Sequence, residues 1–270
     1  MNLDGYSGAT RVVFIVGDPI AQVKSPAGVT ALMRQRGADA ICVPAHVRPQ
    51  DLPDFVRLAG RLPNVDGILV TVPHKFAVLP LCSSLAPRAR SIEAVNMMRR
   101  DTAGGWHGDM SDGEAFVAAL RDAGATLPGR RALLVGAGGA GSAIAHALAD
   151  AGVAEIALHD ADATRREALT AKLRGYEGVH GRVPVSVGSD DPAGFDVVCH
   201  ATPLGMRPGD PLPWRAERLD PGAVVGDVVT VPAEPPLVRE ARARGHRVST
   251  GVDMFERVRH IIVDFLLEKP

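Results

Sequence analysis

The chain has 270 residues, 46% of them hydrophobic, and a formal net charge of −1. This length and composition suit a globular protein of one large domain or two ordinary ones. The near-neutral charge argues against nucleic acid or an anionic membrane as a partner, and the few aromatic residues are scattered. Cys42, Cys82 and Cys199 are too widely spaced for a metal site or a redox pair, so we expect no metal.

Targeting signals are absent from the pattern of charge and hydropathy. The N-terminal segment has no basic region followed by an apolar one. No apolar run approaches the roughly eighteen residues that a membrane helix needs. We therefore expect a cytoplasmic protein with a small-molecule ligand, no nucleic acid and no membrane, acting as a monomer or homodimer.

Strand-like and helix-like segments alternate through the first part of the chain. We predict strands over residues 11–17, 40–45, 67–72 and 94–98, and helices over 26–36, 50–58 and 76–83. A further helix begins at Ser111, with Glu114 completing a capping box, and ends at Gly124. We place the domain junction here, so residues 1–111 form the first predicted domain.

The second part of the chain repeats the alternation. We predict strands over residues 132–135, 155–158, 184–187, 196–200, 223–228 and 247–249, and helices over 142–151, 165–173, 237–244 and 253–267. Such alternation indicates an α/β fold with parallel sheets covered on both faces. Residues 112–252 form the second predicted domain, and the final helix, residues 253–270, is expected to pack back on the first.

A glycine-rich turn, GAGGAG, follows the strand 132–135 and opens the next helix. Its core is Gly136, Gly138 and Gly141, with Ala137, Gly139 and Ala140 between them. Glycines permit a tight turn and a close approach to a pyrophosphate, whose charge meets the free amides at the helix start. This context predicts a Rossmann-type dinucleotide-binding domain, with a tight turn that binds nothing as the plainer alternative.

Asp160 follows the next strand, where a Rossmann fold places the acid that binds the adenosine ribose. A carboxylate there would repel the additional phosphate of NADP, so we expect NAD to be favoured over NADP. Arg165 and Arg166 could instead serve a phosphate, and Asp160 or Asp162 could simply cap the following helix.

Lys75 ends the stretch ILVTVPHK, in a chain where only four of the 30 basic residues are lysines. A desolvated lysine can release a proton, which arginine cannot, so Lys75 is a candidate proton carrier. Its alternative is a solvated surface charge.

Six segments of the chain match one family in order. They are GDPIAQVKSP (17–26), ILVTVPHK (68–75), EAVN (93–96), GDMSDG (108–113), ATPLGM (201–206) and GVDMF (251–255). Together with GAGGAG they resemble the shikimate dehydrogenase family, including its quinate/shikimate members. The resemblance implies an N-terminal α/β substrate domain, a Rossmann-type NAD(P) domain, an active site in the cleft between them, and a place in aromatic amino acid biosynthesis.

The resemblance also implies roles for individual residues. Lys75 matches the catalytic lysine and Asp112 the aspartate beside it. The positions that match substrate contacts are Ser25, Thr71 and Asn96. Those that match the cofactor site are Gly136, Ala137, Gly138, Gly139, Ala140, Gly141, Asp160, Thr202, Val228 and Gly251. In such an enzyme the hydride passes to the cofactor, the amine takes the hydroxyl proton, and Asp112 orients the amine. His74 is treated as lining.

The sequence also departs from the family pattern at positions near the substrate. Val23 stands where the family has a hydroxyl that helps to hold the substrate carboxylate, and Val258 replaces a glutamine that reaches the substrate. Leu69 and Thr230 replace an asparagine and a tyrosine. Each lost donor to a carboxylate weakens binding by roughly 1.5–3 kcal/mol. We therefore expect a working dehydrogenase whose ring alcohol differs from shikimate, such as quinate or a less polar relative.

Two other interpretations remain. The chain could be a regulatory relative that binds a nucleotide or ring acid without catalysis, although such a protein has no need of Lys75 and Asp112. It could also be a dehydrogenase of a one-carbon folate derivative, which the GDPI and GDMSDG segments disfavour.

Overall fold

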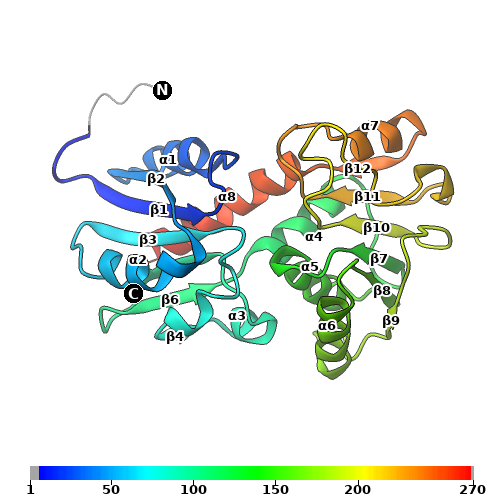
Figure 1. Ribbon diagram of the computed structural model, residues 1–270, viewed down its shortest axis with the longest axis horizontal. Helices are drawn as coiled ribbons and strands as arrows, with labels where there is room; N and C mark the ends of the chain where they lie inside the picture. Colours follow the sequence, from blue (N-terminus) through cyan, green and yellow to red (C-terminus); the bar gives the residue numbers. More distant parts are fainter. Residues whose placement is uncertain (1–5, 269–270) are drawn as a thin grey trace. The chain divides into compact units, whose positions relative to one another are not determined.

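The computed structural model describes residues 6–268 of the chain (Figure 1). Its contacts fall into two compact units. Unit 1 comprises Met1–Ser111 with Val258–Pro270, and unit 2 comprises Asp112–Arg257. Each unit has its own six-stranded sheet. Which unit binds a substrate and which a cofactor stays a prediction at this level.

The sheet of unit 1 is mixed. Its strands are β1 (Arg11–Gly17), β2 (Ala40–His46), β3 (Val65–Val70), β4 (Ser84–Leu85), β5 (Met97–Arg100) and β6 (Trp106–Asp109), in the spatial order β2-β1-β3-β5-β6-β4. β1, β2 and β3 are parallel, whereas β5 runs antiparallel to both β3 and β6. The carboxyl ends of β1 and β3 therefore meet at one edge of the sheet, where the first candidate residues follow.

Helices cover both faces of this sheet. They are α1 (Ser25–Gln35), α2 (Leu52–Ala59), α3 (Pro87–Ile92) and the part of α8 (Gly251–Leu267) from Val258 onward. Phe14 of β1 packs edge-on against Phe55 of α2, with ring centroids 5.3 Å apart. On the opposite face a side chain at Gly67 would overlap Leu266 of α8. Glycine at this position therefore lets α8 lie directly on the sheet.

Unit 2 has a fully parallel sheet. Its strands are β7 (Arg131–Val135), β8 (Glu155–His159), β9 (Val185–Val187), β10 (Val197–His200), β11 (Val224–Asp227) and β12 (Arg247–Ser249), in the spatial order β12-β11-β10-β7-β8-β9. The strand order reverses between β7 and β10. In an open parallel sheet this reversal is the place where ligands bind, beyond the carboxyl ends of the strands.

The helices of unit 2 are α4 (Asp112–Asp122), α5 (Gly139–Asp150), α6 (Ala163–Gly175) and α7 (Pro236–Ala243). Phe116 of α4 fills the space over Gly226 of β11. The next residue back, Val225, faces the other way into an apolar cluster with Leu237 and Ala241 of α7. Successive strand residues point to opposite faces, so α4 and α7 cover opposite sides of this sheet.

The α/β class and the Rossmann-type arrangement expected from the sequence are confirmed. Several details differ. β4, β6 and α3 were not expected, and the helix predicted over 76–83 is reduced to a single 3₁₀ turn at Leu79–Leu81. β6 reads WHGD, which is too short and too poor in β-branched residues to predict a strand, and its pairing with β5 creates the strand.

Two features are absent from residues 6–268. No helix in this part of the chain is long and apolar enough to cross a membrane. No group of three or more His, Cys, Asp or Glu side chains in the same residues is arranged to hold a metal ion.

Candidate functional site

Lys75 lies just beyond the carboxyl end of β3, in a turn that starts at Thr71. Hydrogen bonds anchor this turn on both sides: the Thr71 amide donates to Val16 at 2.9 Å, and the Lys75 carbonyl accepts from Val95 at 2.8 Å. Lys75 is half-buried. The fold thus holds its backbone firmly while its long side chain keeps access to solvent.

His74, beside Lys75, has a different environment. Its side chain is only 1% exposed, and Nε2 lies 2.7 Å from the carbonyl oxygen of Val47. Because a carbonyl can only accept, Nε2 carries the proton and donates it. His74 therefore ties the turn to the end of β2, and this nitrogen is committed to the backbone.

The segment before α1 lies against the same turn. The Asp18 amide donates to the Val72 carbonyl at 2.9 Å, and a side chain at Gly17 would meet Thr71. Ser25 is the first residue of α1 and is buried, with Lys24 rather than Ser25 at the cap position. Val23 is half-buried.

Asn96 joins this group through the end of β3, because its carbonyl accepts from Val70 at 2.8 Å. Its side chain holds Ser111 by hydrogen bonds: Nδ2 donates to the Ser111 hydroxyl and Oδ1 accepts from the Ser111 amide, both at 3.0 Å. Both residues are buried. Asp112, the next residue, is buried and starts α4. Asn96 thus fixes the segment that leads directly into Asp112.

One ion pair in this region was not foreseen. Arg88 of α3 forms a two-pronged pair with the buried Asp109, with Nε–Oδ1 and Nη2–Oδ2 distances of 2.7 Å each. Asp109 Oδ1 also accepts from the Met110 amide at 2.7 Å. This carboxylate is therefore occupied by protein donors. Val258, the last substrate candidate, is an apolar, 8% exposed residue of α8.

In unit 2 the glycine turn has the geometry that the sequence predicts for a phosphate-binding loop. Gly136 has a φ of 115°, a conformation that side chains with a Cβ rarely adopt. A side chain at Gly141 would overlap the Gly136 carbonyl. α5 begins at Gly139, three residues earlier than predicted, so the amides of Gly139 to Gly141 belong to its first turn. Helix-terminal amides of this kind bind phosphate.

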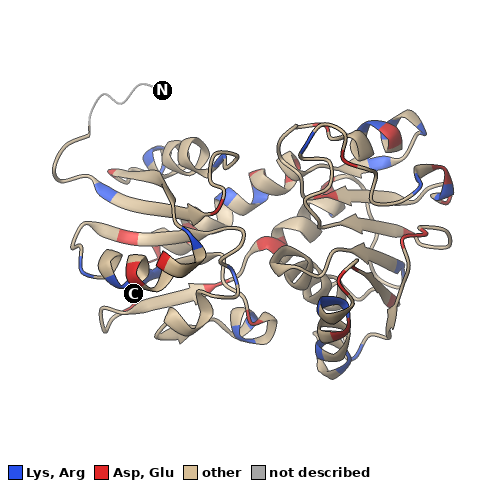
Figure 2. Ribbon diagram, in the orientation of Figure 1, with Lys and Arg blue, Asp and Glu red and all other residues tan. Residues whose placement is uncertain are grey.

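Asp160, at the end of β8, organises this turn from the side. Its Oδ2 accepts from the Ala137 amide at 2.7 Å, and its Oδ1 accepts from the Asp162 amide at 2.8 Å and from the Arg165 guanidinium at 3.3 Å. The side chain is 7% exposed. Arg165 begins a strongly basic stretch of α6, which is visible in Figure 2.

The remaining cofactor candidates follow other strands of the same sheet. Thr202 lies two residues beyond β10, and its methyl group would meet a side chain at Gly136. Val228 follows β11 and is half-buried. Gly251 starts α8, where any side chain would overlap the carbonyl of Val229. Because the carboxyl ends of the parallel strands β7, β8, β10 and β11 lie at one edge of the sheet, these candidates lie at one edge of unit 2.

The sequence reasoning passed over His200 and Asp227, the last residues of β10 and β11. Both are 0% exposed, and their side chains lie 3.2 Å apart. In the sequence, these two residues stand out only because each is a polar residue at the end of an apolar strand.

The three cysteines are expected to stay protonated and therefore to be poor nucleophiles. Burial raises the pKa of the Cys42 and Cys82 thiols to about 12, and also raises the pKa of Cys199.

Comparison with known proteins places this arrangement in context. Residues 15–98 match the model of the shikimate dehydrogenase substrate binding domain. A shikimate dehydrogenase (NADP(+)) of Rubrobacter xylanophilus is 37% identical over 246 residues, which cover 91% of this chain and 86% of the relative. A quinate dehydrogenase from Corynebacterium glutamicum, solved in complex with NAD, is 27% identical with a TM-score of 0.84, covering 96% of this chain and 94% of that one. The ligand-free 5-ketofructose reductase of Gluconobacter sp. strain CHM43 is 29% identical, with the same TM-score and coverage.

These findings correct one prediction. The expectation that NAD is favoured over NADP is wrong, because curated relatives that are 33% to 37% identical are NADP(+) enzymes, and a solved relative binds NADP+. The physical reason lies in the contacts of Asp160. Its charge is shared among two amides and Arg165, so it does not present the unpaired negative charge that would repel a phosphate.

Proposed function

The chain belongs to the shikimate dehydrogenase family, and on this premise we propose that it transfers a hydride between NADP and a secondary hydroxyl of a shikimate- or quinate-like ring acid. The observation that carries the proposal is the pairing of two features in one chain. Unit 1 holds Lys75, Thr71 and Asn96 around the end of β3, and unit 2 holds a glycine turn at the reversal of a parallel sheet.

The residues of unit 2 fit a dinucleotide. Side chains at Gly136 and Gly141 would overlap the backbone of Ala201 and the Gly136 carbonyl, and a side chain at Gly138 would enter open space, so glycine keeps the turn tight and its outer side uncovered at the start of α5. The first amides of α5 would hold the pyrophosphate, and Asp160 keeps the turn in place through Ala137. When bound, the nicotinamide supplies the group that accepts or donates the hydride.

We assign proton transfer to Lys75 and Asp112. During oxidation the Lys75 amine would take the proton of the substrate hydroxyl, and in the reverse direction its ammonium would return it. The Asp112 carboxylate would hold the ammonium in position. Ser25, Thr71 and Asn96 would bind the other polar groups of the ring.

The substrate itself is proposed to differ from shikimate in how its carboxylate is held. Val23 and Val258 are apolar side chains with no hydrogen bond to offer, so two contacts expected of the family are missing. Quinate or a less polar ring alcohol suits such a site. The proposed location is the cytoplasm, as composition suggests, with a monomer or homodimer as the working form.

Steady-state assays that follow reduced nicotinamide test the function and the substrate together. Purified protein would be screened with NADP against shikimate, quinate and neutral cyclic polyols. We expect turnover, with a lower kcat/KM for shikimate than for the preferred alcohol. Rapid NADP-dependent oxidation of shikimate would overturn the altered-substrate proposal. Cofactor binding without turnover on any alcohol would favour the regulatory alternative.

Lys75→Met tests the proton carrier. The substitution keeps an unbranched side chain only one atom shorter but removes the amine, so kcat should fall by roughly 10²- to 10⁴-fold. The dissociation constant of NADP, measured by fluorescence titration, should stay within about twofold, because only transition-state stabilisation is lost. Lys172→Met, on α6 of unit 2, is the matched control and should keep full activity. An active Lys75→Met protein would contradict the assignment.

A further inference from the structure

His200 lies in unit 2, at the centre of the sheet that we assign to the nucleotide. It ends β10, directly between Asp227 on β11 and Val135 on β7, whose next residue is Gly136. The ring is fully buried and packs edge-on against Trp214 at 6.0 Å. Few polar side chains of unit 2 are enclosed to this degree, and the chemistry assigned above does not use it.

The two ring nitrogens of His200 have different partners. Nδ1 lies 3.2 Å from Oδ2 of Asp227, and Nε2 lies 2.5 Å from the hydroxyl oxygen of Thr202. Asp227 is itself held, because its Oδ1 accepts from the Val229 amide at 2.6 Å. Since a carboxylate only accepts, Nδ1 carries a proton. Asp227 therefore fixes the orientation of the ring, and the ring fixes Thr202.

Thr202 keeps one further hydrogen-bonding position in either charge state of His200. A hydroxyl has one donor and two acceptor positions. If the ring is neutral, Thr202 donates to Nε2 and accepts from the Leu204 amide at 3.2 Å, which leaves one acceptor position. If the ring is charged, Thr202 accepts from both groups, and its own O–H is left to donate. The half-buried Thr202 therefore presents one directed polar contact.

The sheet order indicates what this contact meets. Thr202 follows β10, on one side of the strand-order reversal, whereas Asp160 follows β8 on the other. A dinucleotide lies across such a reversal, with its adenosine ribose toward the acidic residue. The half of the cofactor on the β10 side is then the nicotinamide ribose with its carboxamide.

We infer that His200 is a positioning residue, which Asp227 orients and which aims the Thr202 hydroxyl at the nicotinamide half of the dinucleotide. This inference rests on the proposed function, since it assumes a nicotinamide cofactor. It extends that proposal by assigning the Asp227–His200–Thr202 chain to one half of the ligand.

The test separates the two halves of the cofactor. NADPH is titrated into the full-length protein by fluorescence, and adenosine 2′,5′-bisphosphate, which lacks the nicotinamide half, by calorimetry. His200→Asn and Thr202→Val should each weaken NADPH binding by about tenfold and leave the bisphosphate unchanged. Because both act through one hydroxyl, the double variant should lose little more than either single one.

Thr202→Val retains the shape of the side chain, so it covers the case in which His200→Asn fails to fold. Thr202→Ser restores the hydroxyl and should bind NADPH almost as the natural protein does. Ser249→Ala removes a buried hydroxyl from β12 of the same sheet, one with no partner among the described residues, and should change nothing.

Three results overturn the inference. If His200→Asn and Thr202→Val bind NADPH with unchanged affinity, the Thr202 hydroxyl does not contact the cofactor. If the variants bind NADPH and the bisphosphate equally weakly, the Asp227–His200–Thr202 hydrogen bonds only support the fold. Failure of Thr202→Ser to restore binding removes the hydroxyl from the explanation. If the natural protein binds neither ligand, the proposed function itself fails.

Discussion

Arg165 changes how the Asp160 carboxylate should act on a cofactor, because its guanidinium pairs with that carboxylate. The carboxylate of Asp160 is 7% exposed and accepts from two backbone amides, so it stabilises the turn whatever cofactor is bound. Arg165 adds a positive charge beside Oδ1 of Asp160, on a side chain that is 57% exposed. A residue that the sequence pattern assigns to NAD thus becomes compatible with NADP.

Arg165→Ala should therefore weaken NADP more than NAD. Without the guanidinium, the Asp160 carboxylate keeps only its amide donors, and the local potential becomes more negative. We expect the dissociation constant of NADP to rise by about tenfold, measured by fluorescence titration. Arg174→Ala, at the other end of α6, serves as the control. Equal changes for both cofactors would show that Arg165 supports the fold rather than the choice of cofactor.

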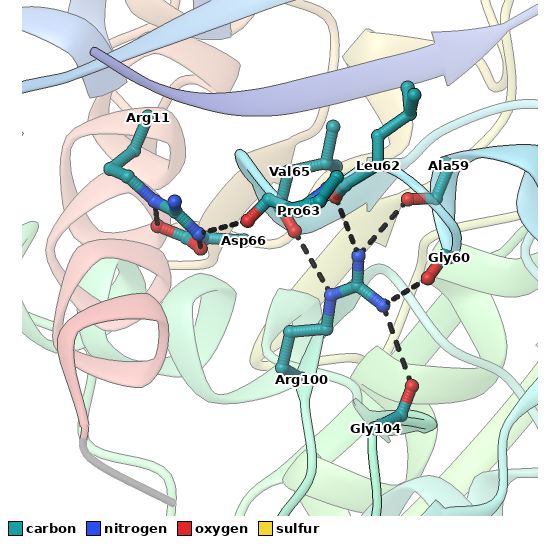
Figure 3. A network of polar contacts seen from close by, with 9 residues as sticks. All are labelled: Arg11, Ala59, Gly60, Leu62, Pro63, Val65, Asp66, Arg100 and Gly104. Atoms are coloured by element: carbon teal, nitrogen blue, oxygen red, sulfur yellow. Dashed lines mark hydrogen bonds and ion pairs between the residues drawn. The ribbon is translucent and has the colours of Figure 1, made fainter. Parts of the chain in front are cut away.

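At the scale of the element, the carbonyl groups at the end of helix α2 accept hydrogen bonds from a residue of strand β5. Arg100 of β5 donates to five backbone carbonyls, those of Val65, Gly60, Gly104, Ala59 and Leu62, at 2.7 to 3.4 Å (Figure 3). Its guanidinium also lies over the Trp106 ring at 4.5 Å. Burial lowers the pKa of Arg100, although the group stays charged.

Arg100→Met should destabilise unit 1 by about 2–3 kcal/mol, because the carbonyls at the end of α2 lose charged donors that water replaces poorly. Urea unfolding followed by circular dichroism measures the change. Arg11→Met is the neighbouring control in Figure 3. Arg11 pairs with Asp66, and because the two side chains are 43% and 38% exposed, solvent screens the pair and its loss should cost less than about 1 kcal/mol. Equal losses would contradict the role given to the end of α2.

Elements also show where sequence reasoning succeeds. The strands β1, β3, β7 and β10 are apolar runs that are buried by helices, so local pattern and tertiary structure agree. β6 and α3 have no such pattern: β6 pairs with β5, and α3 is held by the contact between Arg88 and Asp109. The family motifs pointed to Lys75, Asn96 and Gly136, whose roles stay predictions. They did not reveal His200 or Asp227, because a link between the ends of two strands depends on their register.

At the scale of the whole molecule, the sequence anticipated an α/β fold and membership of the family, and both are confirmed. The choice of cofactor was wrong because the charge of Asp160 was considered without the donors that surround it. The assignment of substrate to the N-terminal domain and cofactor to the second stays a prediction. Each unit has its own sheet and core, which makes that assignment testable by ligand.

Hydrogen exchange measured by mass spectrometry provides this test. A ligand that binds only the native form slows exchange through local opening, by on the order of 100-fold when its concentration is 100 times its dissociation constant. NADP should therefore protect the turn from β7 into α5 and the residues after β8 and β10, where its amide contacts are proposed. Quinate should instead protect the turn around Lys75 and the start of α1. Protection of unit 1 by NADP alone, or of the glycine turn by quinate alone, would reverse the assignment, because each unit carries the backbone groups proposed for only one of the two ligands.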